Sequence, residues 1–215
     1  MKAKLIILST TLLLMSCFTP KKTQINKSND FTTNQRSLIN KADNKTPMEI
    51  LLITNKEDSM ILRTKSKDIN LKDKDIQKFS DRLLATVKDP KNMGVGIAAP
   101  QVGILKNMII IQRYDLPNFP YQTYLNPKIR QYSKKTQFCL EGCLSIPKRM
   151  DTTKNRAYAI MVEYDMLDGT HKIEMVEAFT AVIFQHEIDH LNGILYLDHL
   201  DLEIRDAEKR LNGKQ

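Results

Sequence analysis

Two histidines and a glutamate form the sequence pattern with the clearest chemical meaning. His186 and His190 are four residues apart, and Glu187 lies between them. Residues at this spacing share one face of an α-helix, so both imidazoles could bind a single metal ion. Cys143, farther upstream, could add a thiolate ligand. Three protein ligands would leave one tetrahedral position for water, which is typical of a catalytic metal site rather than a structural one.

The hypothesis of a metal site requires that a helix hold the two histidines, and the sequence predicts that this helix is buried. The residues just before them, 178–184, are apolar on nearly every side, and Gly193 follows where a helix C-terminus favours glycine. A buried helix must satisfy its polar side chains, and metal ligation would satisfy both imidazoles together. The alternative is a chance match on an ordinary helix, with the histidines hydrogen-bonded in the core.

Other segments predict the elements around that helix. Apolar residues recur at helical spacing over residues 73–87, which predicts an amphipathic helix. Residues 108–111, 159–164 and 170–176 are expected to be strands, and Asp168-Gly169 the turn between the last two. Short strands with helices before and after them favour an α+β domain.

Length and charge set further bounds. The chain has 215 residues, of which 41% are hydrophobic and 27% charged, as expected for one well-packed globular domain. The net charge of +8 could indicate a nucleic-acid partner. The lysines are spread along the chain, however, and there is no nucleic-acid motif and no tryptophan, so we expect a solvated cationic surface and no nucleic-acid binding.

The N-terminus has the features of an export signal. Two lysines precede an apolar run over residues 5–15 that is too short to span a bilayer, so residues 1–17 are expected to be a signal peptide. The run ends at Leu14-Met15-Ser16-Cys17, which resembles a bacterial lipoprotein box, and lipidation of Cys17 would anchor the protein in the cell envelope. The alternatives are cleavage elsewhere, or a start farther downstream that leaves the protein in the cytoplasm.

The next segment, residues 18–46, is rich in Asn, Thr, Lys and Ser and has no hydrophobic period, which predicts a flexible linker. The catalytic domain is then expected over residues 47–212. Met48 opens the first plausible core segment and could also be an internal start.

A third motif brings a family resemblance. Residues 94–101 read Gly-Val-Gly-Ile-Ala-Ala-Pro-Gln, which matches neither a P-loop nor a dinucleotide fingerprint. Together with Glu-Gly-Cys-Leu-Ser at 141–145 and Gln-His-Glu-Ile-Asp-His at 185–190, it resembles the three defining motifs of the peptide deformylases. The resemblance runs from about Met48 to Leu200 and implies that family's fold, with short antiparallel strands packed around a central metal-binding helix.

Peptide deformylases remove the formyl group from N-formylmethionyl peptides and release formate. The resemblance implies that a metal-bound water attacks the formyl carbon, with Glu187 as general base and acid and with Gln101 and the backbone N–H of Leu144 holding the oxyanion. It implies three metal ligands, Cys143, His186 and His190. Fe(II) is the implied native ion, although these ligand types also suit zinc, nickel and cobalt.

The resemblance also implies an ion pair and a substrate pocket. Glu141 is expected to pair with a downstream arginine, for which Arg156 is the candidate. An apolar pocket should hold the methionine side chain, and the aliphatic candidates for it could alternatively only pack the core. The residues expected to bind substrate are Val95, Gly96, Glu141, Gly142, Phe179, Val182 and Ile183. The sequence leaves the oligomeric state open.

Cys139 is expected to be a small buried apolar residue; the alternative is a redox partner of Cys143, and a disulfide between them would abolish the site.

Two other functions remain open. A zinc metalloprotease would need a third ligand, but Tyr196 occupies the place of a third histidine, Glu208 is the only tempting carboxylate, and neither explains Cys143 or Gln101. A non-catalytic, lipid-anchored binding module would explain export, since formylated chains emerge from cytoplasmic ribosomes.

Overall fold

The protein is described by a computed structural model over residues 30–212, and it has the α+β architecture that the sequence predicts. The elements follow one another as α1 (Thr33–Asn40), α2 (Lys56–Leu62), α3 (Ile76–Lys88), β1 (Gly96–Ala98), the 3-10 helix η2 (Ala99–Val102), β2 (Met108–Gln112), β3 (Tyr121–Tyr132), β4 (Thr136–Cys143), β5 (Ile146–Ala157), β6 (Ala159–Asp165), β7 (His171–Glu177), α4 (Ala178–Leu191) and α5 (Tyr196–Asn212).

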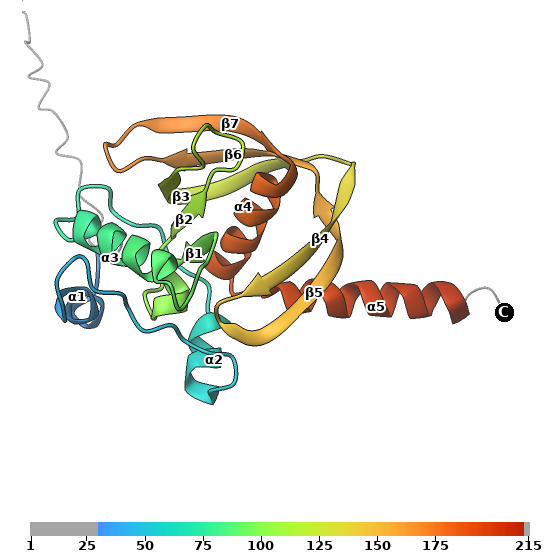
Figure 1. The fold of residues 1–215 in the computed structure, drawn as a ribbon, viewed down its shortest axis with the longest axis horizontal. Helices are drawn as coiled ribbons and strands as arrows, with labels where there is room; N and C mark the ends of the chain where they lie inside the picture. Colours follow the sequence, from blue (N-terminus) through green and yellow to red (C-terminus); the bar gives the residue numbers. More distant parts are fainter. Residues whose placement is uncertain (1–29, 213–215) are drawn as a thin grey trace, which may run out of the picture.

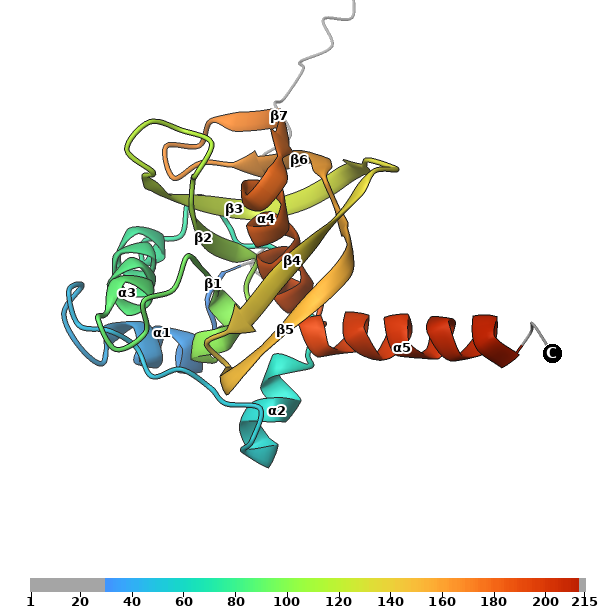
Figure 2. The same ribbon diagram turned by 45° about the vertical axis from the view of Figure 1, so that its right-hand side comes forward.

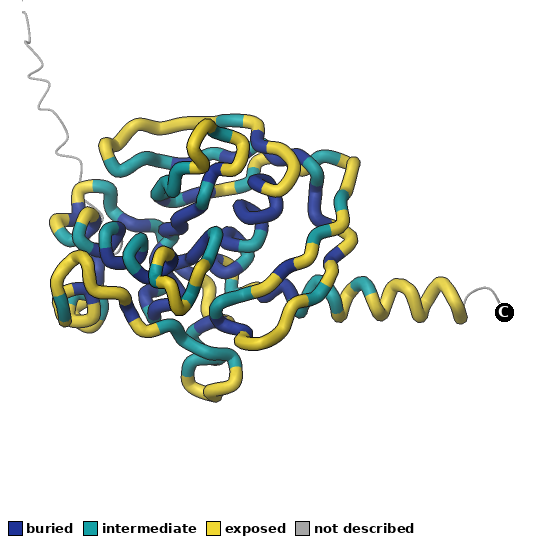
Figure 3. Tube along the Cα trace, viewed as in Figure 1, coloured by how far each residue is buried: buried dark blue, intermediate teal, exposed yellow. Residues whose placement is uncertain are grey.

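The helix α4 occupies the centre of the fold, as predicted. The strands form a five-stranded antiparallel sheet in the order β1-β2-β3-β6-β7 and a separate two-stranded sheet of β4 and β5. Figures 1 and 2 show α4 running between the two sheets, and it contacts all seven strands. Helix α4 is therefore buried on nearly all sides, as Figure 3 shows, which explains its apolar composition.

The predicted amphipathic helix and the predicted strands are present. Helix α3 buries Ile76, Phe79, Leu83 and Val87, which follow the helical spacing seen in the sequence. Strand β2 is buried along most of its length, because the sheet is covered on both faces there. Strands β6 and β7 form a hairpin around Asp168-Gly169, and Gly169 has the positive φ (82°) that this turn requires.

The prediction of a flexible linker over residues 18–46 is wrong from residue 30 onward. Helix α1 begins with a capping box in which the Thr32 hydroxyl accepts from the Gln35 N–H and the Gln35 side chain accepts from the Thr32 N–H. Phe31 and Ile39 are buried in the main core beside α3. The helix is short and mostly polar, so its stability comes from tertiary packing, which a local hydrophobic period does not reveal.

Buried polar contacts fasten this segment to the body. The Arg36 guanidinium binds both carboxylate oxygens of Asp73, whose side chain is almost completely buried. The buried guanidinium of Arg82 on α3 donates to backbone carbonyls of Leu38, Ile39, Thr46 and Pro47. The folded unit therefore includes residues 30–46 and does not begin at residue 47. The predicted signal peptide (1–17), the lipidation site Cys17 and the rest of the predicted linker (18–29) lie outside the described residues.

Elements α2, β1, β3, β4, β5 and α5 were not predicted from the sequence. Strand β5 is exposed along most of its length and rich in Lys, Arg and Thr, so it shows no alternation between polar and apolar residues. Helix α5 packs only its first turns on the body, and its far half projects into solvent in Figures 1 and 2. Within residues 30–212, no helix is both long and apolar enough to cross a membrane.

The core segment expected after Met48 is extended rather than a regular strand. The Leu51 N–H donates to the carbonyl of Gln101 (2.8 Å), and the Ile53 N–H donates to the carbonyl of Ser145 (2.9 Å). The segment is thereby bonded both to Gln101 of the Gly-rich motif and to Ser145 of the cysteine motif. It helps to bring the Gly-rich motif and the cysteine motif side by side.

Candidate active site

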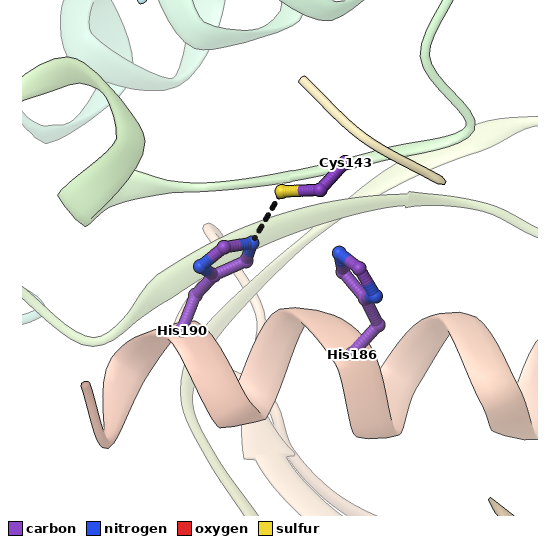
Figure 4. A group of neighbouring side chains, drawn as sticks. All are labelled: Cys143, His186 and His190. Atoms are coloured by element: carbon purple, nitrogen blue, oxygen red, sulfur yellow. Dashed lines mark hydrogen bonds between the residues drawn. The ribbon is translucent and has the colours of Figure 1, made fainter. Parts of the chain in front are cut away.

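Helix α4 and the end of strand β4 bring the three predicted metal ligands together. His186 and His190 lie one turn apart on the α4 face that meets β4, and Cys143 is the last residue of β4 (Figure 4). One ligand atom from each residue lies within 4.8 Å of the other two. The Cys143 Sγ is 3.2 Å from Nε2 of His190. Two imidazoles and a thiol are thus gathered at one point, although they come from elements far apart in the sequence.

A buried carboxylate orients one of the imidazoles. Nδ1 of His186 lies 2.8 Å from Oε2 of Glu141, so Nε2 of that ring is left for another partner. Glu141 also forms a two-pronged ion pair with Arg156, at 2.8 and 2.9 Å, and both side chains are only 3% exposed. Burial alone would raise the pKa of Glu141, but the hydrogen bonds from His186 and Arg156 outweigh it and hold the pKa well below its usual range.

The Gly-rich motif places an amide group beside the thiol. Gln101 lies on η2, and its Oε1 accepts from the Ala98 N–H at 2.9 Å. This bond fixes the amide so that Nε2 points to the Ser145 hydroxyl (3.2 Å) and to the Cys143 sulfur (3.6 Å). Gln101 is therefore a preorganised donor at the edge of the three-ligand group.

Glu187 is buried beside the same group. It lies against β1, where a Cβ on Gly96 would stand only 2.4 Å from Oε1 of Glu187, so only glycine permits this close approach. Its Oε2 is buried and has no hydrogen-bond partner among the described residues. Burial raises the pKa of Glu187 to about 7, with further contributions from neighbouring carboxylates. A carboxyl group in this state can both accept and return a proton near neutral pH.

An open pocket of about 980 Å³ leads to these groups. It runs between the β1 end of the Gly-rich motif and strand β4, and the N-terminal half of α4 forms its floor. Leu144 lines it next to Cys143, and so do all the residues that the sequence assigns to substrate binding: Val95, Gly96, Glu141, Gly142, Phe179, Val182 and Ile183. Phe179 is 41% exposed, whereas Val182 and Ile183 are buried. On the α4 wall of the pocket, Phe179 is therefore exposed to the pocket, whereas Val182 and Ile183 line it and also pack in the core.

The combination of a Cys–His–His group, a buried glutamate and a fixed glutamine at the base of one pocket matches the arrangement expected from the three motifs. A family model described as polypeptide deformylase matches residues 48–206. The chain belongs to the peptide deformylase family. It is accordingly an enzyme, and the non-catalytic binding module that the sequence left open is not supported.

Curated relatives and solved structures agree with this assignment. A peptide deformylase from Synechocystis is 35% identical over 164 residues, which covers 75% of this chain and 83% of the relative. A class I type b peptide deformylase from Acinetobacter baumannii, solved with Met-Ala-Ser bound, has a TM-score of 0.63 at 31% identity and covers 72% of this chain and 99% of its own. The Thermotoga maritima enzyme has a TM-score of 0.63 at 31% identity, with 71% and 97% covered.

The residues of the site fit a divalent metal. A thiol and two imidazoles are typical ligands of zinc, iron, nickel and cobalt, and the carboxylate on the second nitrogen of His186 is the usual support for a metal-binding histidine. Nδ1 of His190 is buried and has no hydrogen-bond partner among the described residues, so this ring is held less firmly. The deformylase family is metal-dependent, in agreement with this donor set.

Several residues of the site were not apparent in the sequence. Ser145 is fully buried and accepts from Gln101, and Thr153 donates to Glu141. Asp189 lies 2.6 Å from Arg156 and 2.8 Å from His199. His199 is thus part of the hydrogen-bond network around Asp189 of α4. The available signal was that Ser145 and Asp189 both lie within the motifs at 141–145 and 185–190, where the sequence assigned them no role.

Cys139 is half-buried in the wall of the pocket, not in the core as expected. Both Cys139 and Cys143 are free thiols. They are four residues apart along the extended strand β4, a separation of about 13 Å, and a disulfide needs Cα atoms within about 7 Å. The redox pair is therefore excluded while β4 stays intact.

The geometry also argues against a metalloprotease. The ring of Tyr196 stacks against His186 with centroids 6.0 Å apart, so Tyr196 packs on the site and offers no third imidazole. Glu208 is exposed on the projecting half of α5, away from the two histidines. Among the described residues, Cys143 is the side chain that completes a three-ligand group.

Proposed function

We propose that this deformylase hydrolyses the formamide bond of N-formylmethionyl peptides, with one divalent metal held by Cys143, His186 and His190. The observation that carries the proposal is the approach of one sulfur and two imidazole nitrogens to within 4.8 Å at the base of the pocket. We take Fe(II) as the native ion because the family resemblance implies it; the thiolate and imidazole ligands would also accept zinc, nickel or cobalt. A cation here supplies Lewis-acid activation of water and of the formyl oxygen.

Glu187 moves the proton. Water adds to the formyl carbon, the C–N bond breaks, and the products are formate and the free amine of the peptide. The proton that water loses must reach the departing nitrogen. Glu187 is buried, has a free oxygen and has a pKa near 7, so its carboxylate can accept this proton and then return it to the amine.

Gln101 and Leu144 stabilise the charge that develops on the formyl oxygen. The Gln101 amide is locked by its bond to the Ala98 N–H, so its donor need not reorganise during the reaction. The backbone N–H of Leu144, next to Cys143, is the second donor. Each such donor can contribute about 2.7 to 4 kcal/mol to the transition state, judged from donor deletions in other hydrolases.

The methionine side chain enters the apolar part of the pocket. Val95, Phe179, Val182 and Ile183 line this part, and burial of an apolar side chain of this size contributes about 1.5 to 3 kcal/mol. The solved Acinetobacter baumannii relative binds Met-Ala-Ser, which supports a peptide that begins with methionine. Gly96 of β1 and Gly142 of β4 line the same pocket and complete the proposed substrate contacts. Glu141 is buried at the base of the pocket and would act through His186.

The test is formate release from formyl-Met-Ala by the full-length chain, loaded with Fe(II) without oxygen. The wild type should turn over, and Glu187→Gln should lose about 10² to 10⁴ in kcat while it keeps one equivalent of metal. Glu177→Gln, a change of an exposed carboxylate at the start of the same helix, is the matched control. Formate release by Glu187→Gln at the wild-type rate would exclude this mechanism.

We also propose that Cys17 is lipidated and holds the enzyme at the cell envelope, where it would act on exported or shed formyl peptides. The support is the sequence around Cys17 alone. Palmitate labelling of the wild type and of Cys17→Ala tests it. A label in the wild type alone supports the anchor, and absence of a label in both would place the enzyme in the cytoplasm.

An internal start at Met48 would remove α1 and leave the donors of Arg82 unpaired, so this form should fold poorly.

A further inference from the structure

The hairpin of β4 and β5 carries a bulge of three residues at the mouth of the pocket. Cys143 pairs with Ile146, and Gly142, the next residue on β4, pairs with Met150. Residues 147–149 of β5 are therefore extra and have no partner on β4. Lys148, in the middle of the bulge, has a positive φ of 60°, which is rare for a residue with a side chain. Bulges next to active sites commonly re-aim side chains, and this one directs Lys148 and Arg149 to the pocket, which both residues line.

The exposed charges at the pocket are all positive. Lys91, from the loop before β1, is the third exposed charged residue that lines it. The two carboxylates of the lining, Glu141 and Glu187, are buried at its base. Arg149 is partly neutralised by Asp151 at 2.7 Å, and the Asp89 carboxylate near Lys91 accepts that residue's backbone N–H. Within the described part of the chain, neither Lys91 nor Lys148 forms an ion pair.

We call the exposed basic residues Lys91, Lys148 and Arg149 the rim of the pocket. From this rim we infer a substrate preference, which rests on the proposed function. The enzyme favours formyl peptides that carry a carboxylate two or three residues after the methionine, and Lys91 and Lys148 bind that carboxylate. Lys91 and Lys148 line the same pocket as the apolar residues proposed to hold the methionine, so the residues that follow the methionine can reach them. The carboxylate can come from an Asp or Glu side chain or from the free C-terminus of a short peptide. Both sources present the same charge to two unpaired ammonium groups.

The size of the effect follows from exposure. Ion pairs between exposed groups are weak and screened by salt, so each lysine should change kcat/KM by no more than about fivefold. The carboxylate is remote from the reacting bond and has the same contact before and during the reaction. The preference should therefore appear in KM, with kcat nearly unchanged.

The experiment compares kcat/KM for formyl-Met-Ala-Glu-amide, its Gln isostere and its Lys counterpart. A second arm compares formyl-Met-Ala-Ala with a free carboxyl terminus and as the amide. We expect Glu above Gln above Lys, the free acid above the amide, and differences that fade in about 1 M salt, where charges are screened beyond about 3 Å. A preference in only one arm identifies the source of the carboxylate and still supports the inference.

Two double variants distinguish an effect of the rim lysines from an effect of the net charge of the protein. Lys91→Gln with Lys148→Gln should abolish the Glu-over-Gln preference. Lys134→Gln with Lys209→Gln, two exposed lysines outside the pocket, should preserve it. Equal kcat/KM for the charged and neutral peptides, or a preference that survives in the rim variant, would overturn the inference. Deformylation of the neutral Gln peptide tests the proposed function by itself, so the two failures are distinguishable.

Discussion

The Oε2 atom of Glu141 lies 2.8 Å from Nδ1 of His186, and the same carboxylate is clamped by Arg156. Glu141 therefore fixes which nitrogen of His186 carries the proton and which is free for a metal. Arg156 is fixed in turn by Asp189 on the metal helix. The imidazole is thus oriented by a closed network of buried charges.

Glu141→Gln should weaken metal binding while it keeps the shape of the side chain. An amide orients the ring less strongly than a carboxylate, and loss of such a partner typically costs about 10- to 100-fold in metal affinity. Competition with a chromogenic chelator measures this. Glu174→Gln is the control, since Glu174 pairs with the buried Arg113 away from the site. Equal metal affinity in both variants would show that Glu141 does not support the ligand.

Cys143→Ala should not retain stoichiometric metal, because it leaves two imidazoles without the thiolate. Glu208→Ala, on the exposed half of α5, should retain it. Metal analysis after dialysis gives the ratio of metal to protein for each variant. The opposite pattern would favour a metalloprotease-type ligand set over the deformylase one.

Gln101→Leu should retain the metal and lose at least about a hundredfold in kcat. It also leaves the Ala98 N–H without its acceptor, which could lower stability. Gln101→Glu separates the two effects, since a carboxylate can still accept from Ala98 but has no N–H for the oxyanion. Both variants should lose turnover, as measured by formate release, and only the leucine variant should also melt at a lower temperature. Near-normal turnover in Gln101→Glu would remove Gln101 from the catalytic residues.

Arg36→Ala tests whether the N-terminal segment is part of the folded domain. Burial by itself would raise the pKa of Asp73, but hydrogen bonds from Arg36 and from the backbone of Asp75 and Phe31 outweigh it and lower the pKa. The variant leaves a buried carboxylate short of partners, so the free energy of unfolding should fall by about 1 to 3 kcal/mol at about pH 7.

The pH dependence of this loss has a definite sign. Because the pKa of Asp73 is lower in the folded state, its stabilisation is full above the unfolded value of about 3.9 and is lost as pH falls through the folded value. The difference between wild type and Arg36→Ala in urea denaturation should therefore shrink below about pH 4. Arg130→Ala, which breaks an exposed pair with Glu163, should change little at any pH. A stability loss no larger than that of Arg130→Ala would mean that the Arg36–Asp73 pair does not stabilise the fold.

The sequence by itself identified the residues that the structure gathers at the candidate site. The spacing of His186 and His190 fixes their common face, because helix geometry is local and does not depend on the rest of the fold. The apolar residues before them predicted that the helix is buried, and the family resemblance supplied the roles of Cys143 and Gln101. These predictions needed only short-range patterns and the order of three motifs.

Only the tertiary structure decided what surrounds those residues. Ser145 and Asp189 belong to the site through contacts with side chains from other elements, which no local period encodes. Helix α1 looks like linker in sequence because few of its residues are apolar, and it is held by Arg82 and Asp73 from elsewhere in the chain. The bulge that carries Lys148 depends on the register of β4 and β5, and register is set by pairing between strands.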